Sequence, residues 1–530
     1  MANDREIELK LALNPADAMA FRRQPLLSER AIEGPKRRRV FNIYFDTPEL
    51  MLKKRRMALR LRRVGGKWLQ TLKTAGSATA GLHQRGEWEH PLRAPELDLA
   101  VFKDTPLAKL PRSKELHLRL KPVFTTDFQR TTWLIETAAG QRVEVALDQG
   151  VTRCGAKERP VSEVEIELVE GRAMAVFDVA RGLIEQVDLQ PDVLSKAERG
   201  YRLFKPANPM PCRAENVELA ADGSQAQALQ TIAAACIDHF ECNVESALVS
   251  DNPEYFHQLR VALRRLRSAM RIFNPEGQSH LVAELHWLTT TLGTARDWDV
   301  LRIETLPGLV KSFGDAGLQK QILASGKRRQ AMTREAARAA LMSRRHALLV
   351  IELGRWLSDS DELALAVPPA ANDSDASPPP AVLNLAEFAS REIRYRHKQL
   401  LRDAFAVAVQ TAAVRHQVRI DAKRLRYAVD FFSSLFKKNR VKPYLKDLAA
   451  IQEMLGQAND AASAEPLIAA LAPPAPFMQF AQGWLAAKTQ AGLAGVDQRF
   501  ERLQKRRHFW MKKTAAPRAD AKVENAMAKI

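Results

Sequence analysis

The chain has 530 residues, a length that excludes a single compact core and predicts two or three domains. With 46% hydrophobic and 27% charged residues, its composition is that of an ordinary soluble protein. The 81 Lys and Arg residues outnumber the 62 Asp and Glu residues, and the net charge of +19 favours a polyanionic partner: nucleic acid, an anionic membrane surface or polyphosphate.

The cysteines and the N-terminal segment indicate the cellular compartment of the protein. The four cysteines form neither a CxxC pair nor a zinc-binding spacing, so we expect free thiols in a reducing environment. The segment MANDREIELK has no apolar core for secretion, and no run of about 18 apolar residues that could span a membrane occurs. We therefore expect a cytoplasmic protein with no membrane partner.

Residues 1–206 are predicted to form antiparallel strands. Apolar and polar residues alternate with period two in the segments IELKLAL, NIYFDT, ALRLRR, KWLQTLK, EWEH, WLIETA, RVEVALD and SEVEIELVEG. Gly65 and Gly66 mark a hairpin turn, and one helix is expected over residues 174–185. Many strands of similar length favour a barrel or a strongly curved sheet.

Beyond this region the pattern changes to a helical one. A proline-rich break predicts a linker over residues 207–224, and apolar residues with a period of 3.6 then predict helices over residues 225–513. Residues 367–382, rich in Pro, Ala, Asp and Ser, are expected to be a flexible insert, and residues 514–530 a disordered basic tail. The predicted fold class is α+β, with an all-α C-terminal part.

The predicted strands carry charges of both signs on one face, because alternate residues of a strand share a face. The charged sets are Glu6, Glu8 and Lys10; Arg60 and Arg62; Arg85, Glu87 and Glu89; Glu144 and Asp148; and Glu163, Glu165 and Glu167. Such a face is either solvated on an open sheet or lines a closed barrel. Inside a barrel, carboxylates would bind Mg²⁺ or Mn²⁺ and basic groups would clamp phosphate, which favours a metal-bound polyphosphate over nucleic acid.

Several short motifs occur in order along the same residues. They are Glu6-Ile7-Glu8-Leu9-Lys10, Tyr44-Phe45-Asp46-Thr47, Leu59-Arg60-Leu61-Arg62, Leu72-Lys73, Arg85-Gly86-Glu87, Phe128-Gln129-Arg130, Ser162-Glu163-Val164-Glu165 and Ser195-Lys196-Ala197-Glu198-Arg199-Gly200-Tyr201. Together they resemble the CYTH domain, or triphosphate tunnel metalloenzymes, over nearly all of residues 1–206. The resemblance implies an eight-stranded antiparallel barrel that encloses a tunnel.

The resemblance also implies roles for the charged residues. Divalent metal, Mg²⁺ or Mn²⁺, would be bound by Glu6, Glu8, Glu163 and Glu165, with Glu167 as a further candidate. Triphosphate would be held by Lys10, Arg60, Arg62, Lys73, Arg85, Arg130 and Lys196. Lys10 assisted by Tyr44 is the expected proton acceptor for the attacking water. Arg85 stands where many relatives have Lys, which keeps the charge but changes the phosphate geometry.

The helical part contains an internal repeat with a basic stripe in each copy. HQLRVALRRLR at residues 257–267 matches HQVRIDAKRLR at residues 416–426, and LGTARD at residues 292–297 matches LGQAND at residues 455–460. At spacings of three and four, the stripes are His257, Arg260, Arg264 and Arg267 in the first copy and His416, Arg419, Lys423 and Arg426 in the second. Each stripe is either a solvated basic helix face or a polyanion site, and the repeat predicts duplicated helical bundles.

These stripes resemble the CHAD domain over roughly residues 225–513, with Asn459 in the second copy where the first has Arg296. The resemblance implies binding of long-chain polyphosphate and association with polyphosphate granules. A CYTH domain followed by a CHAD domain resembles bacterial inorganic triphosphatases, so we expect hydrolysis of tripolyphosphate to pyrophosphate and phosphate.

Other functions stay open because one fold serves several chemistries. They are a non-catalytic polyphosphate-granule protein, a class IV adenylate cyclase and a thiamine triphosphatase. Specific nucleic-acid binding is not expected. The preferred metal, the oligomeric state and any coupling between the domains are not indicated by the sequence.

Overall fold

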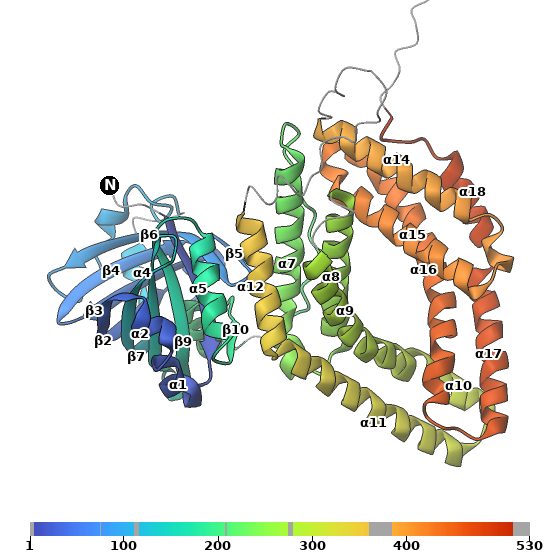
Figure 1. Cartoon of the computed structure of the whole chain (residues 1–530), viewed down its shortest axis with the longest axis horizontal. Helices are drawn as coiled ribbons and strands as arrows, with labels where there is room; N and C mark the ends of the chain where they lie inside the picture. The colour runs from blue at the N-terminus through green and yellow to red at the C-terminus, as the bar shows by residue number, and fades with distance from the viewer. Residues whose placement is uncertain are drawn as a thin grey trace, which may run out of the picture. The chain divides into compact units, whose positions relative to one another are not determined.

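The computed structural model describes residues 5–74, 76–110, 116–206, 209–273, 279–359 and 384–511 (Figure 1). The chain divides into two compact units, Met1–Glu215 with Leu229–Pro369 and Asn216–Ala228 with Ala370–Ile530. The first unit contains the predicted strand domain together with the first helical repeat. The predicted insert at residues 367–382, the predicted tail at residues 514–530 and residues 207 and 208 of the predicted linker lie outside the described residues.

One antiparallel sheet forms the N-terminal domain. Its long strands are β1 (Arg5–Leu13), β2 (Ala31–Asp46), β3 (Met57–Val64), β4 (Lys67–Thr74), β6 (Leu82–Leu92), β7 (Lys121–Glu136), β8 (Arg142–Cys154) and β9 (Lys157–Glu170). The short strands β5 (Ser77–Thr79) and β10 (Leu189–Pro191) flank them. With three residues each, these two strands are too short for an alternation pattern to predict.

Strand pairing closes the long strands into a ring. Their order is β1-β9-β8-β7-β2-β3-β4-β6, and β1 pairs with β9 through residues 8–12 and with β6 through residues 5–9. Within the described residues, the eight long strands therefore have no free edge between them. This confirms the predicted antiparallel barrel, but the strand count of eight was too low, because the short strands β5 and β10 bring the described sheet to ten strands.

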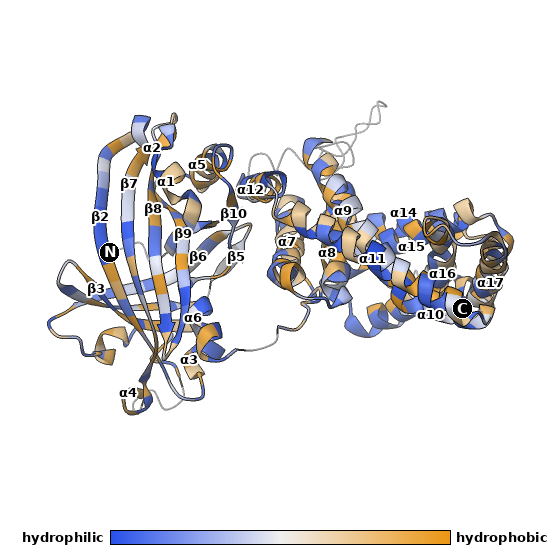
Figure 2. Cartoon of the chain, turned by 90° about the horizontal axis from the view of Figure 1, so that it is seen from below, coloured by the Kyte–Doolittle hydropathy of each residue, from blue (hydrophilic) through white to orange (hydrophobic). Residues whose placement is uncertain are grey.

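The alternation directs charged side chains into the ring and apolar side chains outward. Figure 2 shows hydrophilic and hydrophobic residues alternating along the strands. The outward Leu59 and Leu72 are buried with Leu52, Phe102 and Leu116, which come from α3 (Met51–Lys54), η2 (Leu99–Phe102) and α4 (Leu116–Arg119). α5 (Met174–Ile184) packs on β1 and β9 and confirms the helix predicted over residues 174–185. Much of the apolar core therefore lies outside the ring, whereas the interior holds charged groups together with a small apolar cluster of Val40, Phe128 and Val161.

One further helix, α6 (Lys196–Phe204), reaches the interior of the ring. The hydroxyl of Ser195 caps it by accepting a hydrogen bond from the backbone N–H of Glu198 at 3.1 Å. Capping at this position starts the helix so that Lys196 is buried among the strand carboxylates.

Replacing Gly200 of α6 with alanine should destabilise the domain. A Cβ at Gly200 would lie 2.1 Å from a ring carbon of Phe124 on β7, too close for any real contact. We expect a loss of about 1–3 kcal/mol in the free energy of unfolding, the usual cost of overpacking a core. Urea unfolding measures this, with Gly456→Ala as control, since nothing lies within 4 Å of a Cβ there. Equal free energies of unfolding for the two variants would contradict the close packing of Gly200 against Phe124.

The remaining elements are helices. Before β2 lie η1 (Pro15–Asp17), α1 (Ala18–Arg22) and α2 (Pro25–Glu29). The first helical repeat comprises α7 (Gln225–Val249), α8 (Pro253–Phe273), α9 (Ser279–Val300), the π-turn η4 (Leu301–Thr305), α10 (Leu306–Phe313), α11 (Ala316–Leu341) and α12 (Arg344–Ser358). The second comprises α14 (Leu385–Asp403), η5 (Val407–Val409), α15 (Ala412–Phe431), η6 (Ser433–Leu435), α16 (Lys438–Ala469), α17 (Ala475–Leu493) and α18 (Val496–Lys505). Among the described helices, we find none with both the length and the apolar character of a membrane span.

Candidate active site

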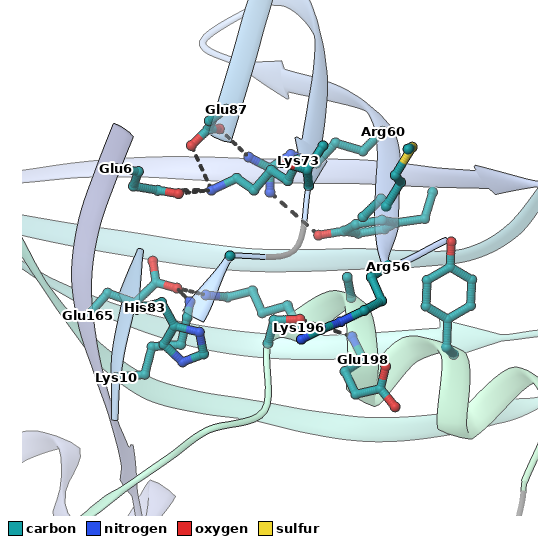
Figure 3. Close-up of a pocket in the computed structure, with 18 of the residues that line it drawn as sticks. Glu6, Lys10, Arg56, Arg60, Lys73, His83, Glu87, Glu165, Lys196 and Glu198 are labelled. Carbon is teal, nitrogen blue, oxygen red and sulfur yellow. Dashed lines mark hydrogen bonds and ion pairs between the residues drawn. The ribbon is translucent and has the colours of Figure 1, made fainter. Parts of the chain in front are cut away.

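A cavity of about 520 Å³ opens inside the ring. Predicted site residues that line it are Glu6, Lys10, Tyr44, Arg60, Arg62, Lys73, Arg130, Glu165 and Lys196. Figure 3 shows part of this lining in two facing rows, one with Glu6, Arg60, Lys73 and Glu87 and the other with Lys10, Glu165 and Lys196. Of the other predictions, Glu8 and Glu163 lie in the same charge network, whereas the side chain of Arg85 lies outside the described part of the structure.

The first row is held together by Lys73 of β4. Its Nζ atom lies 2.8 Å from a Glu6 oxygen and 2.8 Å from a Glu87 oxygen. Arg60 of β3 lies 3.4 Å from Glu87 and 3.5 Å from the hydroxyl of Tyr44. The register explains the contacts, because β4 pairs with β6 at Lys73 and Glu87, and β2 pairs with β3 at Tyr44 and Arg60.

The second row is held together by Lys196 of α6. Its Nζ atom lies 2.6 Å from Asp148, 2.5 Å from Glu163 and 3.0 Å from Glu165. Arg130 adds a two-pronged contact with Asp148, at 2.7 and 2.6 Å, and also binds Glu165. Lys10 binds Glu165 as well and lies 3.2 Å from Glu8.

Asp148 is a site residue that the sequence prediction did not select. Its carboxylate and those of Glu163 and Glu165 have oxygen atoms that all lie within 4.8 Å of one another, close enough to share a cation. Its position was indicated by alternation on β8, but its partner Arg130 depends on the β7–β8 register, in which the two residues face each other. In this structure the shared cation is the Lys196 ammonium.

The four carboxylates predicted to bind metal do not form one group. Glu163 and Glu165 belong to the group around Lys196, whereas Glu6 and Glu8 lie nearer to Glu167, which is opposite Glu8 in the β1–β9 register. Burial, reinforced by the charges of Glu6 and Glu8, raises the pKa of Glu167 to about 7. Carboxylates that repel one another in this way fit a divalent cation, since hard oxygen ligands are those that Mg²⁺ and Mn²⁺ prefer.

The positive charge of Arg62 is only weakly compensated. Burial, together with the neighbouring charges of Arg60 and Arg130, lowers the pKa of Arg62 to about 10. Arg62 donates one hydrogen bond, to the side-chain oxygen of Asn42 at 3.1 Å, and its nearest carboxylate, Glu89, is 3.9 Å away. Because two neighbouring guanidinium groups oppose its charge, Arg62 would be stabilised by an anion with several oxygens bound in the cavity.

The predicted proton acceptor, Lys10, is held in its charged form. Burial opposes the charge, but Glu165 and Glu8 together raise the pKa of Lys10 above its ordinary value. For Tyr44, burial opposes ionisation, but Arg60, Arg62 and Lys196 lower the pKa below its ordinary value. An ammonium group donates hydrogen bonds and accepts none, so this geometry fits Lys10 as a phosphate ligand better than as a base.

The basic stripe of the first helical repeat lies on α8. Burial and the neighbouring Arg296 lower the pKa of His257 to about 4, so the imidazole is neutral. Arg260 donates to the carbonyl oxygen of Gly293 at 2.8 Å and lies 3.0 Å from Asp297. Within the described residues, the buried Nε atoms of Arg264 and Arg267 have no hydrogen-bond partner.

The stripe of the second repeat lies on α15 and repeats one of these contacts. Arg419 lies 3.7 Å from Asp460, which occupies the same place in the repeat as Asp297. His416 is hydrogen-bonded to the side-chain oxygen of Asn459 at 2.7 Å, so the exchange of Arg296 for Asn459 changes a repulsion into a hydrogen bond. Arg426 lies 3.0 Å from Gln452 and 3.7 Å from Asp430. Lys423 also interacts with neighbouring residues.

Known proteins match the two parts of the chain separately. Residues 4–201 match the family model of the CYTH domain, and residues 231–469 match that of the CHAD domain. An inorganic triphosphatase of Haemophilus influenzae is 37% identical over 201 residues, which cover 38% of this chain and 55% of that protein. The chain therefore spans only about half the length of the curated relative that it matches.

Two solved structures are similar to the individual domains. The CHAD domain from the plant Ricinus communis is 34% identical, with 57% of this chain and 99% of that chain covered and a TM-score of 0.48. A putative adenylyl cyclase from Hippeastrum, described as having a dominant triphosphatase activity, is 20% identical, with 38% and 98% covered and a TM-score of 0.27. The two family models together account for most of the sequence, so the chain belongs to both families, with a CYTH domain at residues 4–201 and a CHAD domain at residues 231–469.

Proposed function

We propose that the tunnel hydrolyses inorganic triphosphate to pyrophosphate and phosphate with Mg²⁺ or Mn²⁺. The observation that carries the proposal is the separation of charge in one cavity. The charges of Glu6 and Glu8 oppose the charge of Glu167, while the charges of Arg60 and Arg130 oppose that of Arg62. A metal-bound triphosphate has positive and negative parts that relieve both repulsions. The similarity to an inorganic triphosphatase supports the same substrate.

Different residues of the cavity would bind the metal ion, bind the phosphate oxygens and donate hydrogen bonds to them. Glu6, Glu8 and Glu167 would hold the divalent cation, which on binding supplies Lewis-acid stabilisation and lowers the pKa of bound water. Arg60, Arg62 and Arg130 would bind phosphate oxygens through fixed forks of N–H groups. Lys10 and Lys73, each already between carboxylates, would donate hydrogen bonds to oxygens on which charge develops.

The helical domain would bind long-chain polyphosphate. Arg264 and Arg267 of α8 are partly exposed, and guanidinium groups can donate hydrogen bonds to phosphate oxygens. Such binding would place the protein in the cytoplasm at polyphosphate granules.

Replacing Arg264 with alanine in the full chain should weaken polyphosphate binding about tenfold or more, because a hydrogen bond to a charged group contributes about 1.5–3 kcal/mol. Fluorescence anisotropy with labelled long-chain polyphosphate at fixed salt measures the dissociation constant. Arg328→Ala is the control, since Arg328 of α11 is exposed and donates to Ser325 at 2.8 Å. Equal dissociation constants for the two variants would show that the basic stripe on α8 does not bind polyphosphate.

The experiment that tests the enzyme proposal is a substrate comparison. Phosphate release by the full chain is measured with tripolyphosphate, ATP and thiamine triphosphate, each with Mg²⁺, with Mn²⁺ and with chelator. We expect tripolyphosphate to be hydrolysed fastest and only with metal. Formation of cyclic AMP from ATP would instead indicate a cyclase, and absence of turnover with retained ligand binding would indicate a polyphosphate-binding protein.

A further inference from the structure

A turn of the tunnel domain is held by side chains of the helical domain, within the first compact unit. The turn joins β5 to β6 at residues 79–81. The hydroxyl of Thr79 donates to Asp238 of α7 at 2.6 Å, and the backbone N–H of Ala80 donates to Glu241 of α7 at 2.9 Å. The backbone of Ala80 has a φ of 54° and that of Gly81 a φ of 74°. A non-glycine residue in this conformation is strained and persists only where its surroundings hold it.

The same turn contacts the backbone of Lys10. The backbone N–H of Lys10 donates to the carbonyl oxygen of Gly81 at 3.1 Å, and the carbonyl oxygen of Lys10 accepts from Asp192 at 2.9 Å. A Cβ at Gly81 would lie 3.4 Å from that Lys10 oxygen, so the two backbones approach closely. Two hydrogen bonds in series therefore connect Glu241 of the helical domain to a cavity-lining lysine.

Asp238 also interacts electrostatically with a residue of the cavity, Arg56. Arg56 lines the cavity and points into it in Figure 3, and its charge acts on the Asp238 carboxylate. Its φ of 57° is a second strained backbone conformation in the tunnel domain. The α7 carboxylates thus contact the tunnel domain at the strained Ala80 turn, and one of them also interacts electrostatically with a residue that lines the cavity.

A second helix of the helical domain, α12, packs closely against the same turn and against α5. On α12, a Cβ at Gly354 would lie 2.4 Å from Phe177 of α5 and 2.7 Å from the Cβ of Ala80. Asp178 of α5 accepts from Arg355 of α12 at 3.0 Å. The Ala80 turn is therefore packed against α12 as well as bonded to α7, and it moves only if the contact opens.

We infer that Asp238 and Glu241 are positioning residues of the tunnel, through which the helical domain holds the residue 79–81 turn and Lys10 in the arrangement that binds triphosphate. This inference rests on the proposed function and extends it: a domain that binds one phosphate polymer also sets the geometry of the site that cleaves another. Opening of the α7 contact would release Lys10 from its place and lower turnover without changing any residue that touches substrate.

The test is a set of variants of the full chain. Asp238→Ala with Glu241→Ala should lower kcat/KM for tripolyphosphate about tenfold or more, because a misplacement of about 1 Å in a site can cost a hundredfold. Asp238→Asn with Glu241→Gln should keep nearly full activity, since both amide oxygens still accept from Thr79 and Ala80. Asp178→Asn is the control, because it weakens an ion pair of the same contact away from the turn.

Hydrogen exchange separates positioning from a general loss of structure. The amide of Lys10 should exchange faster in the double alanine variant and at the wild-type rate in the Asn/Gln variant and the control. If the double alanine variant fails to fold, Glu241→Ala alone is compared with Glu241→Gln. If the wild type hydrolyses tripolyphosphate and the alanine variant has a kcat/KM within twofold of the wild-type value, the positioning role is wrong, but the proposed function still stands. Absence of wild-type turnover would overturn the proposed function, and an unchanged Lys10 exchange rate would still count against the positioning role.

Discussion

We expect turnover of tripolyphosphate to fall about a thousandfold when Glu6 and Glu8 are both replaced by glutamine. Glutamine keeps the size of the side chain but removes the charge that a divalent cation requires. Metal-ion catalysis is worth several kcal/mol, and about 4 kcal/mol corresponds to a factor of about a thousand in rate. The fold should survive, because Lys73 retains Glu87 at 2.8 Å and Lys10 retains Glu165.

The measurement is kcat for phosphate release over a range of Mg²⁺ and Mn²⁺ concentrations. Glu170→Gln is the matched control, since Glu170 ends β9 with an exposed side chain and pairs with Arg142 at 3.5 Å. A double variant with a kcat within threefold of wild type, at the same metal concentration, would show that these two carboxylates do not hold the catalytic cation.

Removing the ammonium group of Lys196 is the second large change. Burial opposes its charge, but Asp148, Glu163 and Glu165 raise the pKa of Lys196, so it remains charged. Lys196→Met removes the positively charged partner that these three buried carboxylates have in common. Loss of one partner from a buried ion pair costs about 3–5 kcal/mol. We expect the free energy of unfolding to fall by that amount at pH 7. Added Mg²⁺ should restore part of the loss, because the three carboxylates no longer share the Lys196 ammonium group and can bind the cation instead.

The pH dependence of this loss has a defined sign. Burial raises the pKa values of Asp148 and Glu165, but Arg130 and Lys196, joined for Glu165 by Lys10, hold them below their ordinary values. A carboxylate with a depressed pKa stabilises the folded state above its unfolded pKa of about 4 and loses this effect as the pH falls further. The difference between wild type and Lys196→Met should therefore shrink below about pH 4. Urea unfolding at several pH values measures it, with the exposed Lys157→Met as control, and a constant difference would contradict the charge network.

Alternation and motif order predicted the barrel and most of its interior. Alternation fixes which residues share a face of a strand, but not their depth along the barrel, which depends on register. Glu8 therefore lies opposite Glu167, and Asp148 lies opposite both Arg130 and Glu163, contacts that no local pattern indicates. For this reason the four predicted metal ligands separate into two groups and Asp148 joins the site.

The helical repeat was more predictable because its contacts follow from matched spacings. Arg260 contacts Asp297 and Arg419 contacts Asp460, and each pair joins the first motif of a repeat to the second. The hydrogen bond between Ala80 and Glu241 joins residues 161 positions apart, from different domains. A single sequence carries no signal for such a pair, so the coupling between the domains could only be inferred from the structure.

Anomalous diffraction from crystals of the full chain grown with Mn²⁺ and tripolyphosphate tests the central claim most directly. We expect a manganese peak among the carboxylates of Glu6, Glu8 and Glu167, with phosphate density against Arg60, Arg62 and Arg130. A manganese peak among Asp148, Glu163 and Glu165 with Lys196 displaced, or no manganese inside the ring, would contradict it.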